Sequence, residues 1–526
     1  EDWWPKMVML KVLCQYYSAT KDQRVIPFMT RYFRYQFQNL NACPLKHWTE
    51  WAQSRGEDNI MVVYWLYNLT KDKFLLDLAD LLYKQTFAWT DWFSSRDWVI
   101  NAAAQQNNVD WMHRHGVNVA MGLKTPVIYY QSQNDPKYLA AFKTGFSDLM
   151  NLHGLPMGIF SADEDLHGNA PTQGTELCAI VETMFSLENA IGITGDNMYM
   201  DALERMAFNA LPTQTTDDYN MKQYFQIANQ VQVSRGVFDF SLPFGREMTN
   251  VFGAQSGYTC CLANMHQGWT KYTTHLWFAT PDNGLAALVY GPCKVTAKVA
   301  DGSEVTINEE TAYPFRGNID FTLSLRKKSS FPLEFRIPKW CSEATFTLNG
   351  VKLRSDKGNQ VIRIAREWNN NDKLSVNFSM QVTTSNWGRN SRTVERGPLV
   401  YALKIGERWE KKNIKEEGDF YEIYPTTPWN YGLVRSVVDD PVKNSVVVEK
   451  PLKGDFYWNQ ANAPVEIQVA ARKIPGWILV NGVAYQPVTS REGIYQGKVA
   501  DSVEKITLLP YGCSKIRVVA FPVVKN

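Results

Sequence analysis

The first half of the chain has the hydrophobic spacing of amphipathic helices. Apolar residues recur every three to four positions, as in the run of Leu75, Leu76, Leu78, Ala79, Leu82 and Tyr83. Four short segments, 17–22, 67–72, 130–135 and 191–196, separate such runs, and each ends in Asp, at spacings of 50, 63 and 61 residues. Each segment indicates a tight turn whose Asp caps the next helix. The pattern predicts helical hairpins in series.

Loops between these hairpins vary too much for regular stacking, which favours a closed toroid of paired helices over an open solenoid. We assign residues 1–281 to this (α/α) toroid and expect a fifth hairpin near residues 205–278. A six-pair barrel would then lack a hairpin at its N-terminus. No signal peptide is visible before the helical pattern that follows Glu1. We therefore expect an N-terminally truncated toroid.

After residue 281 the spacing changes to the two-residue alternation of strands. Alternation is clear at 285–290, 295–299, 321–325 and 333–337, and Asn349-Gly350 between two apolar runs is a hairpin signal. We expect a β-sandwich domain over residues 282–404. The charged stretch 407–417 is expected to separate it from a smaller C-terminal β domain, residues 405–526, with strands at 506–510 and 516–520.

Composition excludes several classes of protein. The 55 Lys+Arg residues balance 53 Asp+Glu residues to a net charge of +2, and no basic tract suggests a nucleic-acid partner. No uncharged apolar run approaches the ~20 residues of a membrane span. Eight Cys residues in 526 are too few for a disulfide scaffold. The sequence predicts a multidomain α+β protein without a membrane span.

The strongest chemical signal is one carboxylate and three thiols. Glu176 and Cys178 stand at the start of a predicted helix, and the adjacent pair Cys260 and Cys261 follows downstream. Zinc takes four such ligands tetrahedrally, so the set could bind Zn²⁺. Two alternatives stay open: buried thiols beside a solvated Glu, and a strained disulfide between the adjacent Cys residues.

Other candidate residues are polar groups in loops and at helix ends. Asp163, Glu164 and Asp165 form an acidic loop that suits a proton donor or is simply solvated. His115 could face a ligand or cap a helix, and Glu204 could face a central cavity or form a surface pair. Spacing alone leaves these alternatives open.

Five motifs in order resemble glycoside hydrolase family 127, a β-L-arabinofuranosidase-like group formerly described as a domain of unknown function. They are Thr175-Glu-Leu-Cys-Ala179, Leu203-Glu-Arg-Met-Ala-Phe-Asn209, Cys260-Cys-Leu-Ala-Asn264, Phe335-Arg-Ile-Pro-Lys-Trp-Cys341 and Arg396-Gly-Pro-Leu-Val-Tyr401. The resemblance extends over almost the whole chain.

The resemblance implies a site, residue by residue. Zn²⁺ would be held by Glu176, Cys178, Cys260 and Cys261, with Cys260 also the catalytic nucleophile. Glu164 matches the acid/base glutamate, but the loop that follows is shorter than in the family, so Asp163 and Asp165 stay open. The residues expected to bind the sugar are His115, Glu204, Tyr224 and Tyr258, the last of which replaces a histidine of the family.

The implied activity is that of an exo-acting retaining glycoside hydrolase. It would release an L-furanose from plant cell-wall glycans, either β-L-arabinofuranose or an acidic branched furanose of pectin, and Arg114, His115 or Lys124 could meet the carboxylate of the latter. This substrate class suggests a periplasmic or secreted protein. The oligomeric state stays open.

Two other classes of function compete with this expectation. One is a non-catalytic, zinc-stabilised carbohydrate-binding protein, against which the presence of both Glu164 and Cys260 argues. The other is a lyase or unsaturated uronyl hydrolase on a helical toroid, which needs no thiolate cluster.

Overall fold

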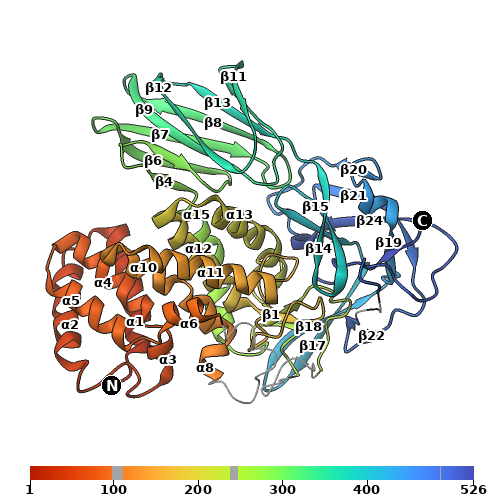
Figure 1. Cartoon of the computed structure of the whole chain (residues 1–526), viewed down its shortest axis with the longest axis horizontal. Helices are drawn as coiled ribbons and strands as arrows, with labels where there is room; N and C mark the ends of the chain where they lie inside the picture. The colour runs from red at the N-terminus through yellow and green to blue at the C-terminus, as the bar shows by residue number, and fades with distance from the viewer. Residues whose placement is uncertain (97–110, 237–246, 486, 488) are drawn as a thin grey trace. The chain divides into compact units, whose positions relative to one another are not determined.

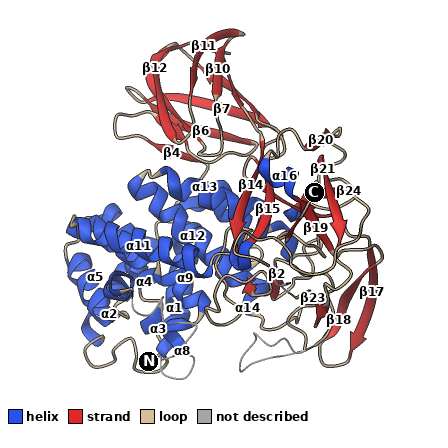
Figure 2. Cartoon of the chain, turned by 45° about the vertical axis from the view of Figure 1, so that its right-hand side comes forward, coloured by secondary structure: helices blue, strands red, loops and turns tan. Residues whose placement is uncertain are grey.

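The computed structural model describes residues 1–96, 111–236, 247–485, 487 and 489–526 (Figure 1). Helices dominate the first half of this part and strands the second half (Figure 2). Backbone contacts divide the chain into an N-terminal unit, residues 1–153 with 164–167, and a larger unit, residues 154–163 with 168–526. Residues 1–281 thus contribute to both units.

The N-terminal unit is helical. Its core includes Trp3, Met29, Phe33, Leu66 and Leu78, all fully buried. The helices of its described residues are α1 (Trp4–Thr20), α2 (Val25–Asn39), α3 (Glu50–Ser54), α4 (Glu57–Thr70), α5 (Phe74–Gln85), α6 (Trp89–Ser95), α8 (Trp111–Arg114), α9 (Gly116–Gly122), α10 (Lys124–Gln133) and α11 (Pro136–His153).

The four predicted turns are confirmed, and they share one backbone device. A residue in the left-handed conformation ends the first helix of each pair: Lys21, Lys71, Asn134 and Gly195, with φ between 52° and 65°. In three of the turns the following Asp accepts a hydrogen bond from the backbone N–H two residues on, as Asp196 does from Met198 at the start of α13 (Asn197–Arg205). The left-handed residue ends the first helix in all four turns. The predicted Asp cap is right for Asp135 and Asp196 and wrong for Asp22 and Asp72, because Arg24 and Lys73 are the N-caps of α2 and α5.

The fifth hairpin expected near residues 205–278 is wrong for the described part of that segment. It contains the π-helical turn η1 (Met206–Ala210), the short η2 (Pro212–Gln214), the strands β2 (Phe225–Ile227) and β3 (Phe252–Gly253), and the helices α14 (Cys260–Asn264) and α15 (Gln267–Thr274). Buried amide side chains bind backbone carbonyls here, for example Gln214 to Tyr224 and Gln226 to Ala210. Such bonds compete with helical ones.

One helix of the described chain, α12 (Leu177–Thr194), is long and apolar enough to cross a membrane by length and composition. However, 72% of this segment is buried inside the protein. Core helices pass the same test, so α12 is weak evidence for a membrane span.

Two antiparallel sheets follow the helices, with one parallel pair where β5 meets β9. Asn349 and Gly350 both have positive φ between β10 and β11, which confirms the predicted hairpin turn. The six-stranded sheet has the order β11 (Val351–Asp356), β10 (Ala344–Leu348), β13 (Lys373–Phe378), β8 (Asn318–Leu325), β7 (Ser303–Thr311) and β6 (Cys293–Val299). The four-stranded sheet has the order β12 (Gln360–Trp368), β9 (Ser329–Ile337), β5 (Leu285–Ala287) and β4 (Trp277–Ala279).

The C-terminal strands form an eight-stranded sheet that crosses the boundary expected at residue 404. Strands from before that boundary pair directly with strands near the C-terminus, since β16 pairs with β24. The sheet contains β14 (Val382–Trp387), β15 (Ser391–Arg396), β16 (Leu399–Leu403), β19 (Tyr431–Val434), β20 (Ser445–Glu449), β21 (Val465–Lys473), β24 (Glu504–Pro510) and β25 (Val523–Val524). The sheet boundary therefore precedes β14.

Two further expectations for this region are wrong. The charged stretch 407–417 contains β17 (Glu407–Ile414), which pairs with β18 (Gly418–Pro425) and through it with β3, rather than a separating linker. Residues 516–520 form no strand, because their backbone groups form hydrogen bonds with residues that do not belong to a paired strand. Arg517 N–H donates to Gln230 O, and Asn229 Oδ1 accepts from the N–H groups of Val519 and Ala520.

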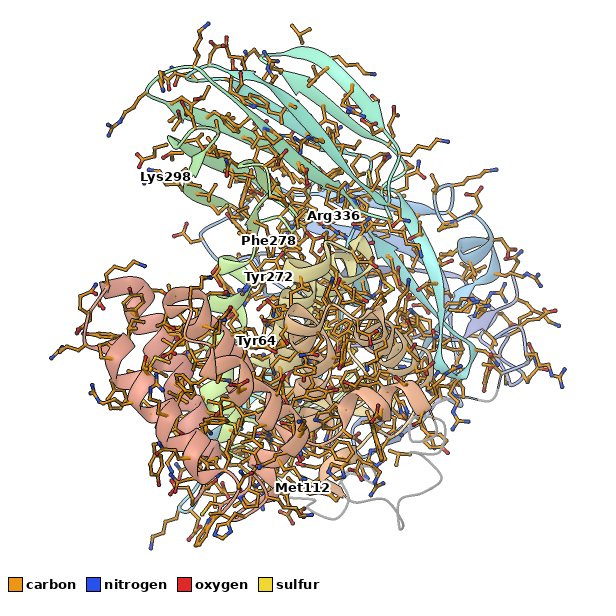
Figure 3. All side chains as sticks on the ribbon, turned by 60° about the vertical axis from the view of Figure 1, so that its left-hand side comes forward. Tyr64, Met112, Tyr272, Phe278, Lys298 and Arg336 are labelled. Atoms are coloured by element: carbon orange, nitrogen blue, oxygen red, sulfur yellow. The ribbon has the colours of Figure 1, made fainter. Side chains whose placement is uncertain are left out.

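A buried charge network joins α13 to β9. The Arg336 guanidinium, fully buried on β9, contacts Asp201 Oδ1 at 2.7 Å and also the Glu204 carboxylate (Arg336 is labelled in Figure 3). Burial raises the pKa of Glu204, and the charge of Arg336 opposes that shift. Removing one partner of a buried ion pair leaves the other charge buried without compensation, so this pair should contribute to the stability of the folded protein.

We expect Arg336→Met to lower the free energy of unfolding of the larger unit by about 3–5 kcal/mol, since Glu204 would stay buried without its cation. Arg363→Met is the control, because Arg363 forms ion pairs near the surface with Asp282 and Glu334, each worth about 1 kcal/mol or less. Urea denaturation of both variants measures the two losses. Equal losses would contradict a special role for the buried pair.

Candidate functional site

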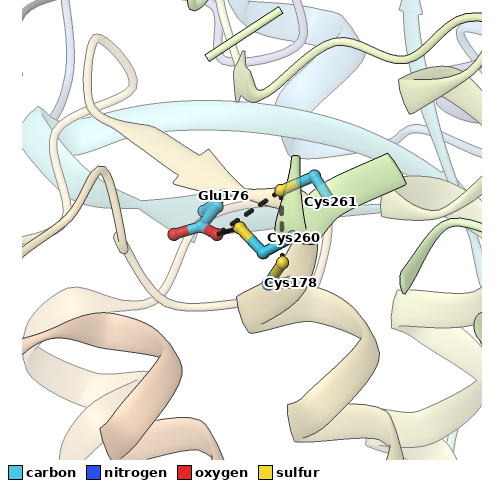
Figure 4. Close-up of side chains that lie close together, drawn as sticks. All are labelled: Glu176, Cys178, Cys260 and Cys261. Atoms are coloured by element: carbon cyan, nitrogen blue, oxygen red, sulfur yellow. Dashed lines mark hydrogen bonds between the residues drawn. The ribbon is translucent and has the colours of Figure 1, made fainter. Parts of the chain in front are cut away.

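The four predicted metal ligands come together in the larger unit (Figure 4). Glu176 ends the strand β1 (Gly174–Glu176), Cys178 lies in the first turn of α12, and Cys260 and Cys261 begin α14. One ligand atom from each lies within 4.8 Å of the other three. Residues 82 or more positions apart in the chain therefore form one cluster.

The distances within this cluster are close to those between the ligands of a single metal ion. Cys178 Sγ lies 3.2 Å from Cys261 Sγ, and Glu176 Oε1 lies 3.4 Å from Cys261 Sγ and 3.5 Å from Cys260 Sγ. Ligands about 2.0–2.3 Å from a tetrahedral zinc ion would be about 3.3–3.8 Å apart. The two distances from Glu176 lie in this range, whereas the two sulfurs are closer than the ~3.8 Å expected of two thiolates on one zinc ion. A small outward shift of these two side chains would let one ion contact all four ligands.

The four ligands differ in their access to solvent. Glu176, Cys178 and Cys261 are buried to 1% exposure or less, whereas Cys260 is exposed. An accessible sulfur and three enclosed ligands give the cluster one reactive position. The disulfide alternative is wrong, because all eight Cys residues are free.

The electrostatics of the thiols follow from burial and from their mutual contacts. Burial raises the pKa of the Cys178 and Cys261 thiols well above the ordinary value. Hydrogen bonds from these two thiols, followed by the charge of Lys222, lower the pKa of Cys260 despite partial burial. The accessible thiol is therefore the one that favours the thiolate form, which is the nucleophilic form of a cysteine.

The acidic loop is held against the start of α9 in the N-terminal unit. Glu164 takes the left-handed conformation with φ of 72°, and its carbonyl accepts from Gly116 N–H at 2.7 Å. Glu164 Oε2 lies 3.3 Å from His115 Nε2, and Asp165 pairs with Arg114 at 3.4 Å. A bulky residue with positive φ is strained and occurs often at functional sites. The solvated-loop alternative is wrong, since all three acids are buried.

The two tyrosines lie beside the cysteine cluster. Tyr258 precedes the Cys pair, and its ring lies 5.7 Å from the ring of buried Tyr224. Tyr224 O accepts from Leu177 N–H at 3.1 Å, between Glu176 and Cys178 in sequence. The substrate contacts predicted for both tyrosines stay predictions.

Glu204, expected to contact the sugar, is bound by protein groups instead. Its carboxylate is fully buried, binds Arg336, and accepts from Tyr290 N–H at 3.0 Å and from the Tyr313 hydroxyl. Both oxygens are held by protein groups in the interior. These surroundings give Glu204 a structural role and lend no support to a contact with substrate.

Sequence reasoning missed Lys222, a fully buried lysine whose ammonium binds the backbone just before the Cys pair. Its local sequence, Asn220-Met-Lys-Gln-Tyr224, has the appearance of a solvated loop. The bonds that bury Lys222 come from residues more than 30 positions away, so no local signal could have indicated it.

Comparisons with known proteins identify the family of the chain. The model of the "Beta-L-arabinofuranosidase, GH127 catalytic domain" matches residues 2–274, and the model of the "Beta-L-arabinofuranosidase, GH127 middle domain" matches residues 284–380. No curated protein matches the chain at the sequence level.

Solved structures share the fold. A GH127 β-L-arabinofuranosidase from Geobacillus stearothermophilus T6 aligns with a TM-score of 0.68 at 17% identity, over 98% of this chain and 79% of that one. A GH127 β-arabinofuranosidase aligns with a TM-score of 0.67 at 16% identity, over 99% and 77% of the two chains. A structure described as a glycoside hydrolase aligns with a TM-score of 0.61 at 17% identity, over 99% and 92%.

These likenesses confirm the predicted fold class, an (α/α) helical toroid followed by β-sandwich units. The catalytic-domain model alone covers more than half of the 526 residues, and the middle-domain model follows it in order. The chain therefore belongs to glycoside hydrolase family 127.

Proposed function

We propose that this glycoside hydrolase is an exo-acting retaining furanosidase that releases β-L-arabinofuranose, or a related acidic furanose of pectin, from plant cell-wall glycans. The observation that carries the proposal is the cluster of Glu176, Cys178, Cys260 and Cys261, in which a single thiol is exposed. The names of the similar structures support arabinofuranose as the sugar. Such a substrate favours a periplasmic or secreted location.

We propose Zn²⁺ as the cofactor, because zinc accepts three thiolates and a carboxylate in a tetrahedral set. Glu176, Cys178 and Cys261 would hold it from the buried side, and Cys260 from the exposed side. When bound, the ion would keep the Cys260 sulfur deprotonated, as metal coordination does for thiols.

In the first half of the proposed reaction, the Cys260 sulfur forms a bond to the anomeric carbon while the bond from that carbon to the leaving oxygen breaks. Glu164 gives its proton to that oxygen. A thiolate can replace the usual carboxylate nucleophile because it is nucleophilic once deprotonated.

In the second half, the Glu164 carboxylate takes a proton from water while the water oxygen attacks the anomeric carbon. The carbon–sulfur bond breaks and the thiolate of Cys260 is restored. Two displacements at one carbon retain its configuration. Among the three acids, Glu164 is favoured because Asp165 is already paired with Arg114, while Glu164 faces His115.

We propose that Tyr224, Tyr258 and His115 contribute to recognition of the sugar. Tyr258 is half-buried and stands two residues before Cys260, which gives its hydroxyl access to the neighbourhood of the reacting thiol. His115 Nδ1 accepts from Asn118 N–H at 3.4 Å, so the side of the ring that would meet the sugar is the Nε2 side, which also faces Glu164 Oε2 at 3.3 Å.

Protein purified without chelator should contain about one zinc ion per chain, because the four ligands form one tetrahedral site. Cys178→Ser should lose most of the metal, and elemental analysis measures the content. Cys341→Ser is the control, since Cys341 is a buried cysteine outside the cluster. Absence of stoichiometric metal from the native protein would remove zinc from the proposal.

Glu164→Gln should lower turnover of natural oligosaccharides by about 10²–10⁴-fold, the usual contribution of a general acid. Formation of the sugar–enzyme bond from an activated aryl furanoside should suffer less, because its leaving group needs little protonation. Steady-state rates on both substrates, with metal content as a control, make the comparison. Near-normal turnover of the natural substrate would assign the role to Asp163 or Asp165.

Release of a monosaccharide from defined arabinan and pectin side-chain oligosaccharides should identify the sugar. Proton NMR of the fresh product should show the β anomer from a β-linked substrate, because two displacements retain configuration. An inverted first product would rule out the covalent mechanism, and release only of longer fragments would rule out exo action.

A further inference from the structure

We propose that Lys222 is a positioning residue of the metal centre: its buried ammonium fixes the backbone that carries Cys260 and Cys261 and balances part of the negative charge of the four ligands. This inference deepens the proposed function and rests on it. Lys222 is not a metal ligand and touches no reacting atom in this assignment.

The contacts of Lys222 hold the segment that leads into α14. Its ammonium donates to Tyr258 O at 2.9 Å and also to Ser256 O, while its own backbone carbonyl accepts from Gly253 N–H at 3.0 Å. One side chain thus donates hydrogen bonds to the two backbone carbonyls on either side of residue 257. The second of these belongs to the residue two positions before Cys260.

Gly257 makes this geometry possible. Its φ is +58°, and a Cβ there would lie 2.3 Å from the Tyr224 ring. Only glycine adopts this turn without strain in so small a space. The turn brings both flanking carbonyls to the same ammonium, so the course of the chain into Cys260 is set by Lys222 and Gly257 together.

The same short segment also touches the other half of the ligand set. Tyr224, two residues after Lys222, accepts through its backbone carbonyl from Leu177 N–H, which lies between Glu176 and Cys178 in sequence. The Lys222 ammonium lies 5.2 Å from the centre of the Tyr224 ring, a favourable cation–π distance. Residues 222–224 therefore connect Glu176 and Cys178 to Cys260 and Cys261.

Charge gives Lys222 its second role. A carboxylate and three thiolates carry four negative charges, and a divalent ion would leave two of them uncompensated. Lys222 is fully buried and forms no ion pair with a carboxylate in the described residues. Burial lowers the pKa of Lys222, while the charges of Cys261, Cys260, Cys178 and Glu176 oppose that shift. An isolated buried ammonium is unfavourable, so these anions are its electrostatic partners.

The test compares zinc affinity in full-length variants. Lys222→Met keeps the length of the side chain but removes the charge and both hydrogen bonds, and should weaken zinc binding by about 10–100-fold, as loss of groups around metal ligands does. Competition with a chromophoric chelator measures the affinity. Lys222→Gln keeps a hydrogen-bond donor but not the charge, so its zinc affinity should lie between that of Lys222→Met and that of the native protein.

Lys515→Met is the matched control. Lys515 is a buried lysine that also donates to two backbone carbonyls, those of Pro212 and Thr215, and none of its hydrogen bonds reaches the segment before the Cys pair. Its loss should leave zinc affinity within about threefold of the native value, below the range expected for groups around a metal.

The outcomes separate this inference from the proposed function. Native protein that binds zinc, with Lys222→Met binding it equally well, would overturn the inference alone. Equal weakening by Lys222→Met and Lys515→Met would also overturn it, because general loss of stability would then explain both. Native protein that binds no zinc would end the proposed metal centre, and the inference with it. If Lys222→Met is insoluble, Lys222→Gln decides by the same criteria.

Discussion

Holding four acidic ligand groups within 4.8 Å of one another is the constraint on which this site depends. Ionised groups at such distances repel strongly when they are shielded from water. Backbone structure places the ligands: Glu176 lies in β1, paired in register with β2, while Cys178 lies in α12 and the Cys pair in α14. The cluster is therefore imposed by the chain around it, and a metal would find its ligands already assembled.

The segment that supports the ligands is held in turn by residues far along the chain in the same unit. Asn209 binds Pro398 O and Val400 N–H, at 2.9 and 2.8 Å. Gln230 donates to Lys515 O at 2.9 Å, and Asn229 binds the backbone of Val519 and Ala520. In a helix or a sheet, backbone groups form hydrogen bonds with other backbone groups. Here the backbone is irregular, and these amide side chains supply the hydrogen bonds instead. The β region thus stabilises the residues from which the site is built.

Local signals predicted much of the fold and the ligand set. The turns before Asp22 and Asp196, and the hairpin at Asn349-Gly350, depend on residues adjacent in sequence, so their patterns were sufficient. Glu176, Cys178 and the Cys pair stood out because thiols are rare and chemically specific. The strand expected at 516–520 failed for the opposite reason: alternating apolar residues also suit an extended segment whose partners are side chains, and only distant residues such as Asn229 decide between them.

The adjacent cysteines explain how one cluster can be both structural and reactive. Successive residues on a helix point about 100° apart, so neighbours at the start of α14 cannot face the same surroundings. Cys261 points inward and meets Cys178 Sγ at 3.2 Å, whereas Cys260 reaches the cluster from the exposed side. Without a metal, burial disfavours ionisation of the inner thiols, and their hydrogen bonds stabilise the thiolate of Cys260. A bound divalent ion would be what ionises the inner pair as well. In the proposed mechanism, a pair of neighbouring thiols would thereby separate the task of anchoring a metal from that of attacking a substrate.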